Sequence, residues 1–154
     1  MKKKWAITGA VILAVFIIIQ FFQPKKNISE VVSPNDIFLQ LQADQPVKDK
    51  IQHVCYNCHS NNTRYPFYGY IAPVSWILNN DIHRGKRHLN FSEWANYSKK
   101  EKLEHLTDIC DEVTSGDMPI KSYTIMHRHS KVNEKEVNDI CAWTDSAGEE
   151  VLSK

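Results

Sequence analysis

Apolar residues along most of this chain recur every three or four positions, which is the period of an amphipathic helix. Val47, Ile51, Val54 and Cys58 follow one another at steps of four, three and four residues, and this spacing predicts one face of a helix. Similar faces recur between residues 103 and 144. We find no alternation of apolar and polar positions long enough to indicate a strand, and no internal repeat. The pattern predicts an all-α fold with long loops.

Capping signals predict where the main helices begin and end. Ser98 and Glu101 have the spacing of a capping box, and Gly116 is a natural stop for the helix that this box opens. Asn133, with Glu136 three positions later, predicts the start of the last helix in the same way. The helix boundaries in the second half of the chain are therefore expected at these residues.

The N-terminal segment 5–22, WAITGAVILAVFIIIQFF, carries no charge and follows three lysines. As a helix it would be roughly 27 Å long, close to the thickness of the hydrocarbon core of a bilayer. The segment ends with the bulky Phe21 and Phe22 rather than with the small residues of a signal-peptidase site. We therefore expect an uncleaved, single-pass anchor in the inner (cytoplasmic) membrane, with the rest of the chain on the periplasmic, extracytoplasmic side.

The chain divides into three parts. We expect the membrane anchor over residues 1–23, a linker with a short helix over residues 24–45, and one compact domain over residues 46–154. The 19 basic and 18 acidic residues give a formal net charge of +1, so the chain lacks the positive field of nucleic-acid-binding proteins. The membrane is an expected partner through the N-terminal helix, and nucleic acid is not.

The sequence CYNCH at residues 55–59 carries the candidate chemistry. Structural zinc usually takes four ligands, often from two Cys-x-x-Cys pairs. The other two cysteines, Cys110 and Cys141, are 31 positions apart and form no such pair. A thioredoxin-like redox pair requires a βαβ context, whereas a predicted helix precedes this motif. Zinc binding and thiol redox chemistry are therefore disfavoured.

A haem attachment site uses every fixed position of the motif. Cys55 and Cys58 stand at positions i and i+3 of the predicted helix, so they share one face and can form thioethers with the two vinyl groups of one porphyrin. His59 follows directly and can bind the iron from the proximal side. The motif predicts covalently bound haem c and its iron. Such attachment takes place outside the cytoplasm, in agreement with the expected anchor.

An electron carrier also needs a sixth iron ligand. Met118 is the preferred candidate because its thioether is a soft ligand that favours ferrous iron, and because Pro119 stiffens the loop that presents it. His127 is the next candidate. The remaining alternatives are Met126, His83 and His129. Three other histidines are expected to be solvated helix or loop residues: His53, His88 and His105.

Three stretches of the chain, CYNCHSNNTRYPFYGYIAPVSWIL, GKRHLNFSEW and GDMPIKSYTIMH, resemble the bacterial haem-binding-domain family of small exported c-type cytochrome-like proteins with a CxxCH motif. The resemblance covers residues 46–145. It implies covalent haem at the two cysteines of the motif and iron ligation by its histidine. The Met-Pro segment and following tyrosine of the family fall on residues 118–123. The stretch HRHSK departs from the family pattern, which leaves the ligand role of His127 open.

Other residues near the motif are candidates for contacts with the haem. Arg64 and the indole N–H of Trp76 are candidates to bind a haem propionate, with a solvated surface position as the alternative for Arg64. Cys110 and Cys141 lie on inward helix faces, where either a disulfide or two buried free thiols fits. The candidates for the pocket wall are aromatic: Tyr56, Tyr65, Phe67, Tyr68 and Trp76.

These features predict a membrane-anchored carrier of single electrons with one covalent haem. No catalytic constellation accompanies the motif, so we expect an electron carrier rather than an enzyme, with redox proteins of the envelope as its partners. The alternative is a haem-based peroxidase, or a gas or redox sensor, with an open distal site. A haem-stabilised interaction module without redox turnover is a third possibility.

Overall fold

The computed structural model describes residues 2–29 and 31–154. Every regular element in this part of the chain is a helix, which confirms the predicted all-α class. The α-helices are α1 (Lys2–Ile19), α2 (Ile37–Gln40), α3 (Gln45–Lys50), α4 (Tyr56–His59), α5 (Val74–His88), α6 (Lys99–Ser115), α7 (Lys121–Met126) and α8 (Glu134–Ser153). A π-helix, η1 (Ile51–Cys55), and three 3-10 helices lie between them: η2 (Phe67–Tyr70), η3 (Phe91–Asn96) and η4 (Arg128–Ser130).

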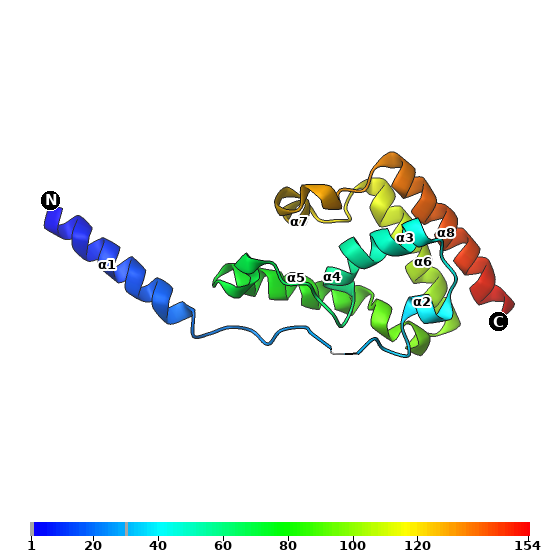
Figure 1. The fold of residues 1–154 in the computed structure, drawn as a ribbon, viewed down its shortest axis with the longest axis horizontal. Helices are drawn as coiled ribbons and strands as arrows, with labels where there is room; N and C mark the ends of the chain where they lie inside the picture. Colours follow the sequence, from blue (N-terminus) through cyan, green and yellow to red (C-terminus); the bar gives the residue numbers. More distant parts are fainter. Residues whose placement is uncertain (1, 30) are drawn as a thin grey trace.

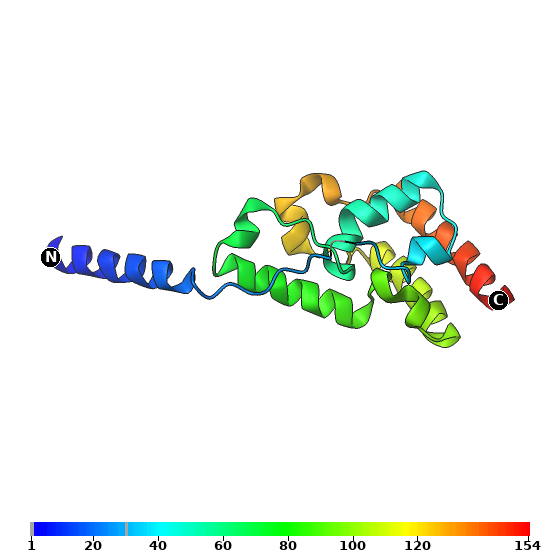
Figure 2. The ribbon, with the colours of Figure 1, turned by 60° about the horizontal axis from the view of Figure 1, so that its bottom comes forward.

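Helices α6 and α8 form an antiparallel pair at the C-terminal end of the molecule (Figure 1). Their direction follows from two contacts, because Lys99 at the start of α6 bonds to the Leu152 carbonyl near the end of α8, and the Cys110 and Cys141 backbones approach midway. The continuous run α3–η1–α4 leads from this pair to α5. Helix α5 extends away from the pair, toward α1, in both views (Figure 2).

Helix α1 corrects the prediction of a membrane anchor. It is 18 residues long and begins with three lysines, so its uncharged part falls short of the ~20 apolar residues that a spanning helix needs. The chain leaves the helix at Gln20, whose side-chain amide exchanges two hydrogen bonds with the backbone of Ala72. In the described chain, none of the helices has the length and apolarity required to cross a membrane. The predicted single-pass anchor, and the inner-membrane location that depended on it, are therefore wrong.

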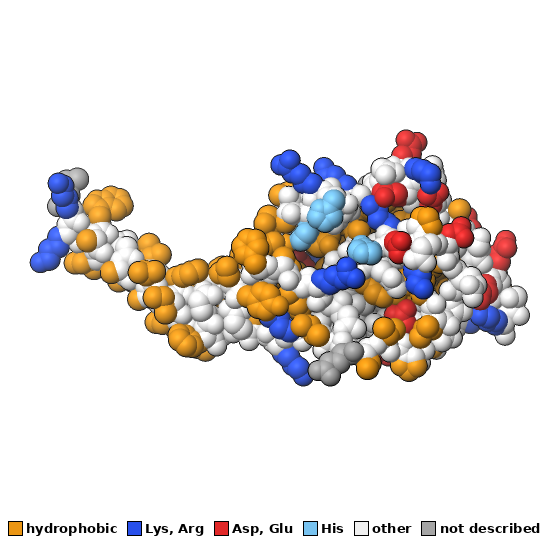
Figure 3. Space-filling model, in the orientation of Figure 1, with side chains coloured by type: hydrophobic (Ala, Val, Ile, Leu, Met, Phe, Trp, Pro, Cys, Tyr) orange, Lys and Arg blue, Asp and Glu red, His pale blue; other side chains and the backbone are white. Residues whose placement is uncertain are grey.

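Apolar and charged side chains are unevenly spread over the surface. Apolar side chains follow α1 and continue onto the adjoining end of the domain, whereas Asp and Glu side chains gather toward the C-terminal end (Figure 3). The segment after α1 runs along the domain, where Asn27 bonds to the Ser60 carbonyl and the Thr63 hydroxyl. Ile37 and Leu41, from the region predicted as a linker, are buried in the core.

The hydrophobic core lies between α2, η1, η3, α6 and α8. A row of aromatic rings crosses it. The Phe91 ring stacks on Tyr56 with centroids 5.1 Å apart, and Tyr56 stacks on Phe38 at 6.0 Å. Phe38 in turn packs against Trp143 of α8. Tyr56 belongs to the CYNCH motif, and its hydroxyl donates to Asp36. The core therefore holds one side of the motif in place.

The predicted capping signals are confirmed. Ser98 and Glu101 form a capping box at the start of α6, with both reciprocal hydrogen bonds present. Asn133 and Glu136 form the second box, at the start of α8. Gly116 ends α6 with φ of 75°, a left-handed conformation that glycine adopts without steric cost. These local signals agree with the fold because each depends on neighbouring residues alone.

Cys110 of α6 and Cys141 of α8 form a disulfide, with Cα atoms 4.8 Å apart. This resolves the choice between a disulfide and free thiols. The bond joins the two longest helices of the domain body and closes a loop with a sequence separation of 31. Closing a loop of that length in the unfolded chain stabilises the native state by about 3–4 kcal/mol.

We expect that replacing both Cys110 and Cys141 with alanine lowers the free energy of unfolding by about 3–4 kcal/mol. Urea unfolding followed by circular dichroism measures this difference. Dithiothreitol serves as the control, because it should lower the stability of the wild type to that of the variant and leave the variant unchanged. An unfolding midpoint that is the same in the wild type and the variant would contradict the prediction.

Candidate functional site

A cavity of about 420 Å³ lies where η1 and α4 meet α5, α6 and the segment before α7. Both cysteines and the histidine of the CYNCH motif line it: Cys55, Cys58 and His59. Met118 lines the same cavity. The structure thus brings together the four residues that the sequence predicts as haem attachment sites and iron ligands.

The apolar spacing predicts that a regular α-helix runs into the motif. The structure differs, because a π-helical turn lies between α3 and α4. The π-helix η1 ends at Cys55, and the amide of Tyr56 donates to the carbonyl of Ile51, five residues earlier. Such a turn holds one more residue than an α-helical turn and often occurs at functional sites. The extra residue turns the following α4 relative to α3. In this arrangement Cys58 and His59 of α4 line the cavity together with Cys55.

The two motif cysteines are free thiols in surroundings that disfavour the thiolate. Burial raises the pKa of Cys55 to about 12. Burial also raises the pKa of Cys58, to about 11, with a further contribution from the nearby Asp81 carboxylate. Redox-active cysteines need a lowered pKa, so the raised pKa values disfavour thiol redox chemistry. Among the described residues, no three His, Cys, Asp or Glu side chains form a group that could hold a metal ion.

His59 is held in the tautomer that an iron ligand requires. Its Nδ1 lies 3.0 Å from the backbone carbonyl of Leu89. A carbonyl accepts hydrogen bonds and cannot donate, so the proton of the ring belongs on Nδ1 and Nε2 keeps a free lone pair. Burial lowers the pKa of His59, which keeps the ring neutral near pH 7. A backbone acceptor on the second nitrogen is the usual way in which proteins orient a metal-binding histidine.

Helix α5 approaches the motif so closely that a side chain would not fit between them. A Cβ atom on Gly85 would stand 2.8 Å from the carbonyl oxygen of Cys58, a distance below van der Waals contact. Leu89 follows Gly85 by one turn and bonds to its carbonyl. The close approach of Gly85 therefore also sets the position of the Leu89 carbonyl that binds His59.

Met118 reaches the cavity because the chain turns sharply after α6. The amide of Met118 donates to the Glu112 carbonyl at 3.0 Å, back across the helix end. His127, the second candidate ligand, does not line this cavity and lies between the rings of Tyr123 and Tyr68. The other candidates for the sixth ligand are exposed: Met126, His83 and His129.

Some predicted haem contacts lie away from the cavity. Arg64 is exposed and lines a second cavity of about 520 Å³ behind the motif. The Trp76 indole N–H donates to the carbonyl of Phe22, so it has a partner of its own. Tyr56 packs in the hydrophobic core, and Phe67 is 79% exposed. None of the five aromatic side chains predicted to form the wall lines the main cavity: Tyr56, Tyr65, Phe67, Tyr68 and Trp76.

Sequence reasoning missed two rows of ionisable residues at the cavity. Helix α5 contributes one row and α6 the other. The α5 row is Asp81, Arg84 and His88, and the α6 row is His105, Asp108 and Glu112. Both rows follow helical spacing, with members three or four positions apart. That spacing was visible in the sequence, but it does not indicate that the two rows face the same cavity.

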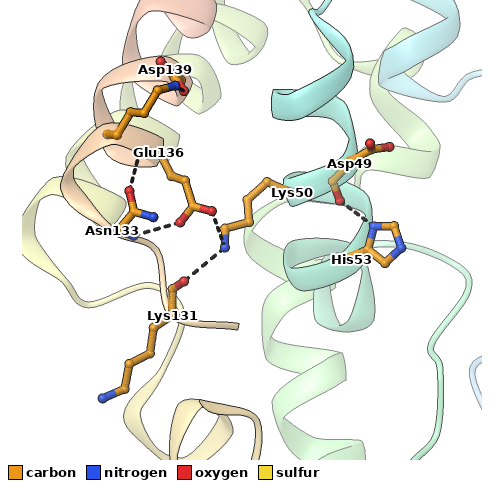
Figure 4. Close-up of polar contacts among 8 residues, drawn as sticks. Asp49, Lys50, His53, Lys131, Asn133, Glu136 and Asp139 are labelled. Atoms are coloured by element: carbon orange, nitrogen blue, oxygen red, sulfur yellow. Dashed lines mark hydrogen bonds and ion pairs between the residues drawn. The ribbon is translucent and has the colours of Figure 1, made fainter. Parts of the chain in front are cut away.

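Polar contacts near the second cavity hold the helix that leads into the motif, and Figure 4 shows them. Lys50 at the end of α3 pairs with Glu136 of α8 at 2.8 Å and donates to the Lys131 carbonyl. Glu136 also accepts from the amide of Asn133 in the capping box. His53 of η1 bonds through Nδ1 to the carbonyl of Asp49. These contacts fasten the N-terminus of α8 to the helix that carries the motif.

A family model described as a haem-binding domain matches residues 14–146. The chain belongs to this haem-binding domain family. No curated protein and no solved structure matches it. The match extends over the motif, the cavity and both cysteines of the disulfide, and it confirms haem as the cofactor.

The residues around the main cavity suit a haem. Apolar side chains such as Leu89 and Ile109 can cover the porphyrin faces. His59 offers an imidazole nitrogen and Met118 a thioether sulfur, which are both iron ligands. The cationic Arg84 lines the cavity and is also exposed to solvent, as a partner for a haem carboxylate needs to be. Arg64 does not line this cavity.

We expect Gly85→Ala to push α5 away from the motif, with a loss of about 1–3 kcal/mol in the free energy of unfolding and reduced haem content. Urea unfolding and absorbance of the bound haem measure the two effects. Gly148→Ala is a matched control, because a Cβ atom there meets Leu103 at 3.8 Å, an ordinary contact. The control should be neutral or slightly stabilising. Equal effects of the two substitutions would contradict the role of the close approach.

Proposed function

We propose that this haem-binding protein is a c-type cytochrome that carries single electrons. One observation carries the proposal: two partly buried thiols, an imidazole oriented by a backbone carbonyl and a thioether line one cavity. The two thiols would attach the haem, and the imidazole and the thioether would bind its iron. When bound, the haem supplies an iron that alternates between the ferric and ferrous states.

Cys55 and Cys58 attach the haem through two thioether bonds in this proposal. Each thiol adds across a vinyl C=C bond, so that a carbon–sulfur bond forms and the thiol hydrogen passes to the other vinyl carbon. The addition changes no net oxidation state and needs no further oxidant or reductant. Burial raises the pKa of both thiols.

His59 and Met118 would both bind the iron. The Leu89 carbonyl orients the imidazole, and the turn at the end of α6 presents the thioether. A haem iron bound by both side chains would have no free position for peroxide or a gas. For this reason we propose electron transfer between redox proteins in preference to the peroxidase and sensor functions.

Covalent attachment predicts that acidified acetone fails to extract the haem from the wild-type protein. The pyridine haemochrome spectrum should be of the c type, with two thioethers. Cys55→Ala should leave one thioether and shift that spectrum, and the double variant with Cys58→Ala should release its haem into the acetone. A b-type haemochrome spectrum of the wild type would exclude covalent attachment.

Met118→Ala should abolish the weak near-infrared band of ferric iron bound to a thioether. The reduction potential should fall, because a thioether stabilises ferrous iron, and the ferrous protein should bind carbon monoxide. Met126→Ala, which removes a methionine that is 58% exposed, is the matched control and should change none of these. Wild-type ferrous protein that binds carbon monoxide readily would instead favour the sensor or peroxidase function.

A further inference from the structure

The segment that carries Met118 has little apolar packing to hold it. Helix α7, which begins three residues after Met118, has no buried residue. Two of its apolar side chains, Ile125 and Met126, are 72% and 58% exposed. A ligand loop must nevertheless keep its sulfur at a defined place, because iron–ligand bonds form over a narrow range of distances. Polar contacts therefore have to position this segment.

Two side-chain contacts tie the segment to the rest of the domain. The Tyr123 hydroxyl accepts a hydrogen bond of 2.8 Å from the side-chain amide of Asn57. Four residues later, the His127 ring lies 3.2 Å from the hydroxyl of Tyr68. At the other end, the Met118 amide is bonded to the end of α6. The segment is thus fixed on both sides of the short helix α7.

Two further hydrogen bonds orient the side-chain amide of Asn57, so that its N–H points to the hydroxyl of Tyr123. The same Nδ2 donates to the His53 carbonyl at 3.0 Å, and Oδ1 accepts from the amide of Arg64 at 3.1 Å. These two bonds determine which side of the amide is nitrogen, so an N–H is presented to Tyr123. Asn57 stands between the two cysteines of CYNCH. One side chain therefore links the haem-attachment motif to the segment with the sixth ligand.

We propose that Tyr123 is a positioning residue that holds Met118 in place on the distal side of the haem through its hydrogen bond to Asn57. The proposal rests on the function proposed above. The Tyr123 ring lines the haem cavity, and its hydroxyl reaches past the cavity to the motif helix. His127 stacks on this ring with centroids 4.4 Å apart. His127 thus supports Tyr123 and does not compete with Met118 for the iron.

Tyr123→Phe tests the proposal because it removes the hydroxyl and keeps the ring that stacks on His127. In the haem-loaded protein, hydrogen exchange of the α7 amides should become about fivefold faster, the usual effect of losing one such hydrogen bond. Carbon monoxide should bind the ferrous variant about fivefold faster, because Met118 leaves the iron more often. The near-infrared band should weaken.

Tyr70→Phe is the matched control. Its hydroxyl makes no hydrogen bond within the described chain, and its ring is 55% exposed. This substitution should leave exchange, carbon monoxide binding and the near-infrared band as in the wild type. Asn57→Ala combined with Tyr123→Phe should bind carbon monoxide at the rate of Asn57→Ala alone, because both substitutions break the same bond. If the two substitutions instead speed carbon monoxide binding independently, so that the double variant shows the product of the two single effects, the proposed coupling of Asn57 and Tyr123 is overturned.

The outcomes separate this inference from the proposed function. If hydrogen exchange of the α7 amides is unchanged in Tyr123→Phe, the bond between Asn57 and Tyr123 does not hold α7 and the proposal is overturned. Faster exchange with unchanged carbon monoxide binding would show that the tie holds α7 without positioning the ligand, which also overturns the proposal. If the wild type has no near-infrared band and Met118→Ala has no effect, ligation by Met118 is wrong and the positioning role fails with it. Exchange would still report whether the Tyr123–Asn57 bond holds α7.

Discussion

The close contact between the end of α5 and the motif helix is the constraint on which the site depends. Gly85 allows the α5 backbone to lie against the Cys58 carbonyl, and one turn later the Leu89 carbonyl meets His59. The first contact sets the distance between the helices. The second sets which imidazole nitrogen is free. A larger residue at position 85 would disturb both, so the proximal side of the haem site is decided by how two helices pack.

The cavity combines apolar surroundings for the thiols with ionisable groups on two helices. Burial raises the pKa of Cys55 and Cys58, so both thiols are protonated near pH 7, in contrast to redox-active thiolates. Asp81, Arg84 and His88 on α5 and the carboxylates on α6 line the same cavity. Asp81 of α5 and the two carboxylates of α6 would repel haem carboxylates, whereas Arg84 would attract them.

The segment that carries Met118 is held in place differently from the CYNCH motif. The proximal motif is held by the core through the stack of Tyr56 and Phe91, by α5, and by the ion pair of Lys50 with Glu136. The distal segment lacks buried apolar residues in α7 and depends on individual hydrogen bonds. The segment that carries Met118 therefore has fewer contacts with the hydrophobic core than the motif has.

The sequence by itself determined whatever depends on residues close together in the chain. The spacing of CYNCH led to haem, which family membership confirms, and both capping boxes stand where their residues predicted. Contacts between residues far apart in the chain were decided by the tertiary structure. Helical periodicity shows which face of a helix is buried, but not which other helix packs against that face. The tertiary structure joined Cys110 to Cys141 and brought Arg84 to the cavity in place of Arg64. It also ended α1 at Ile19, short of the membrane span that uncharged composition alone suggested.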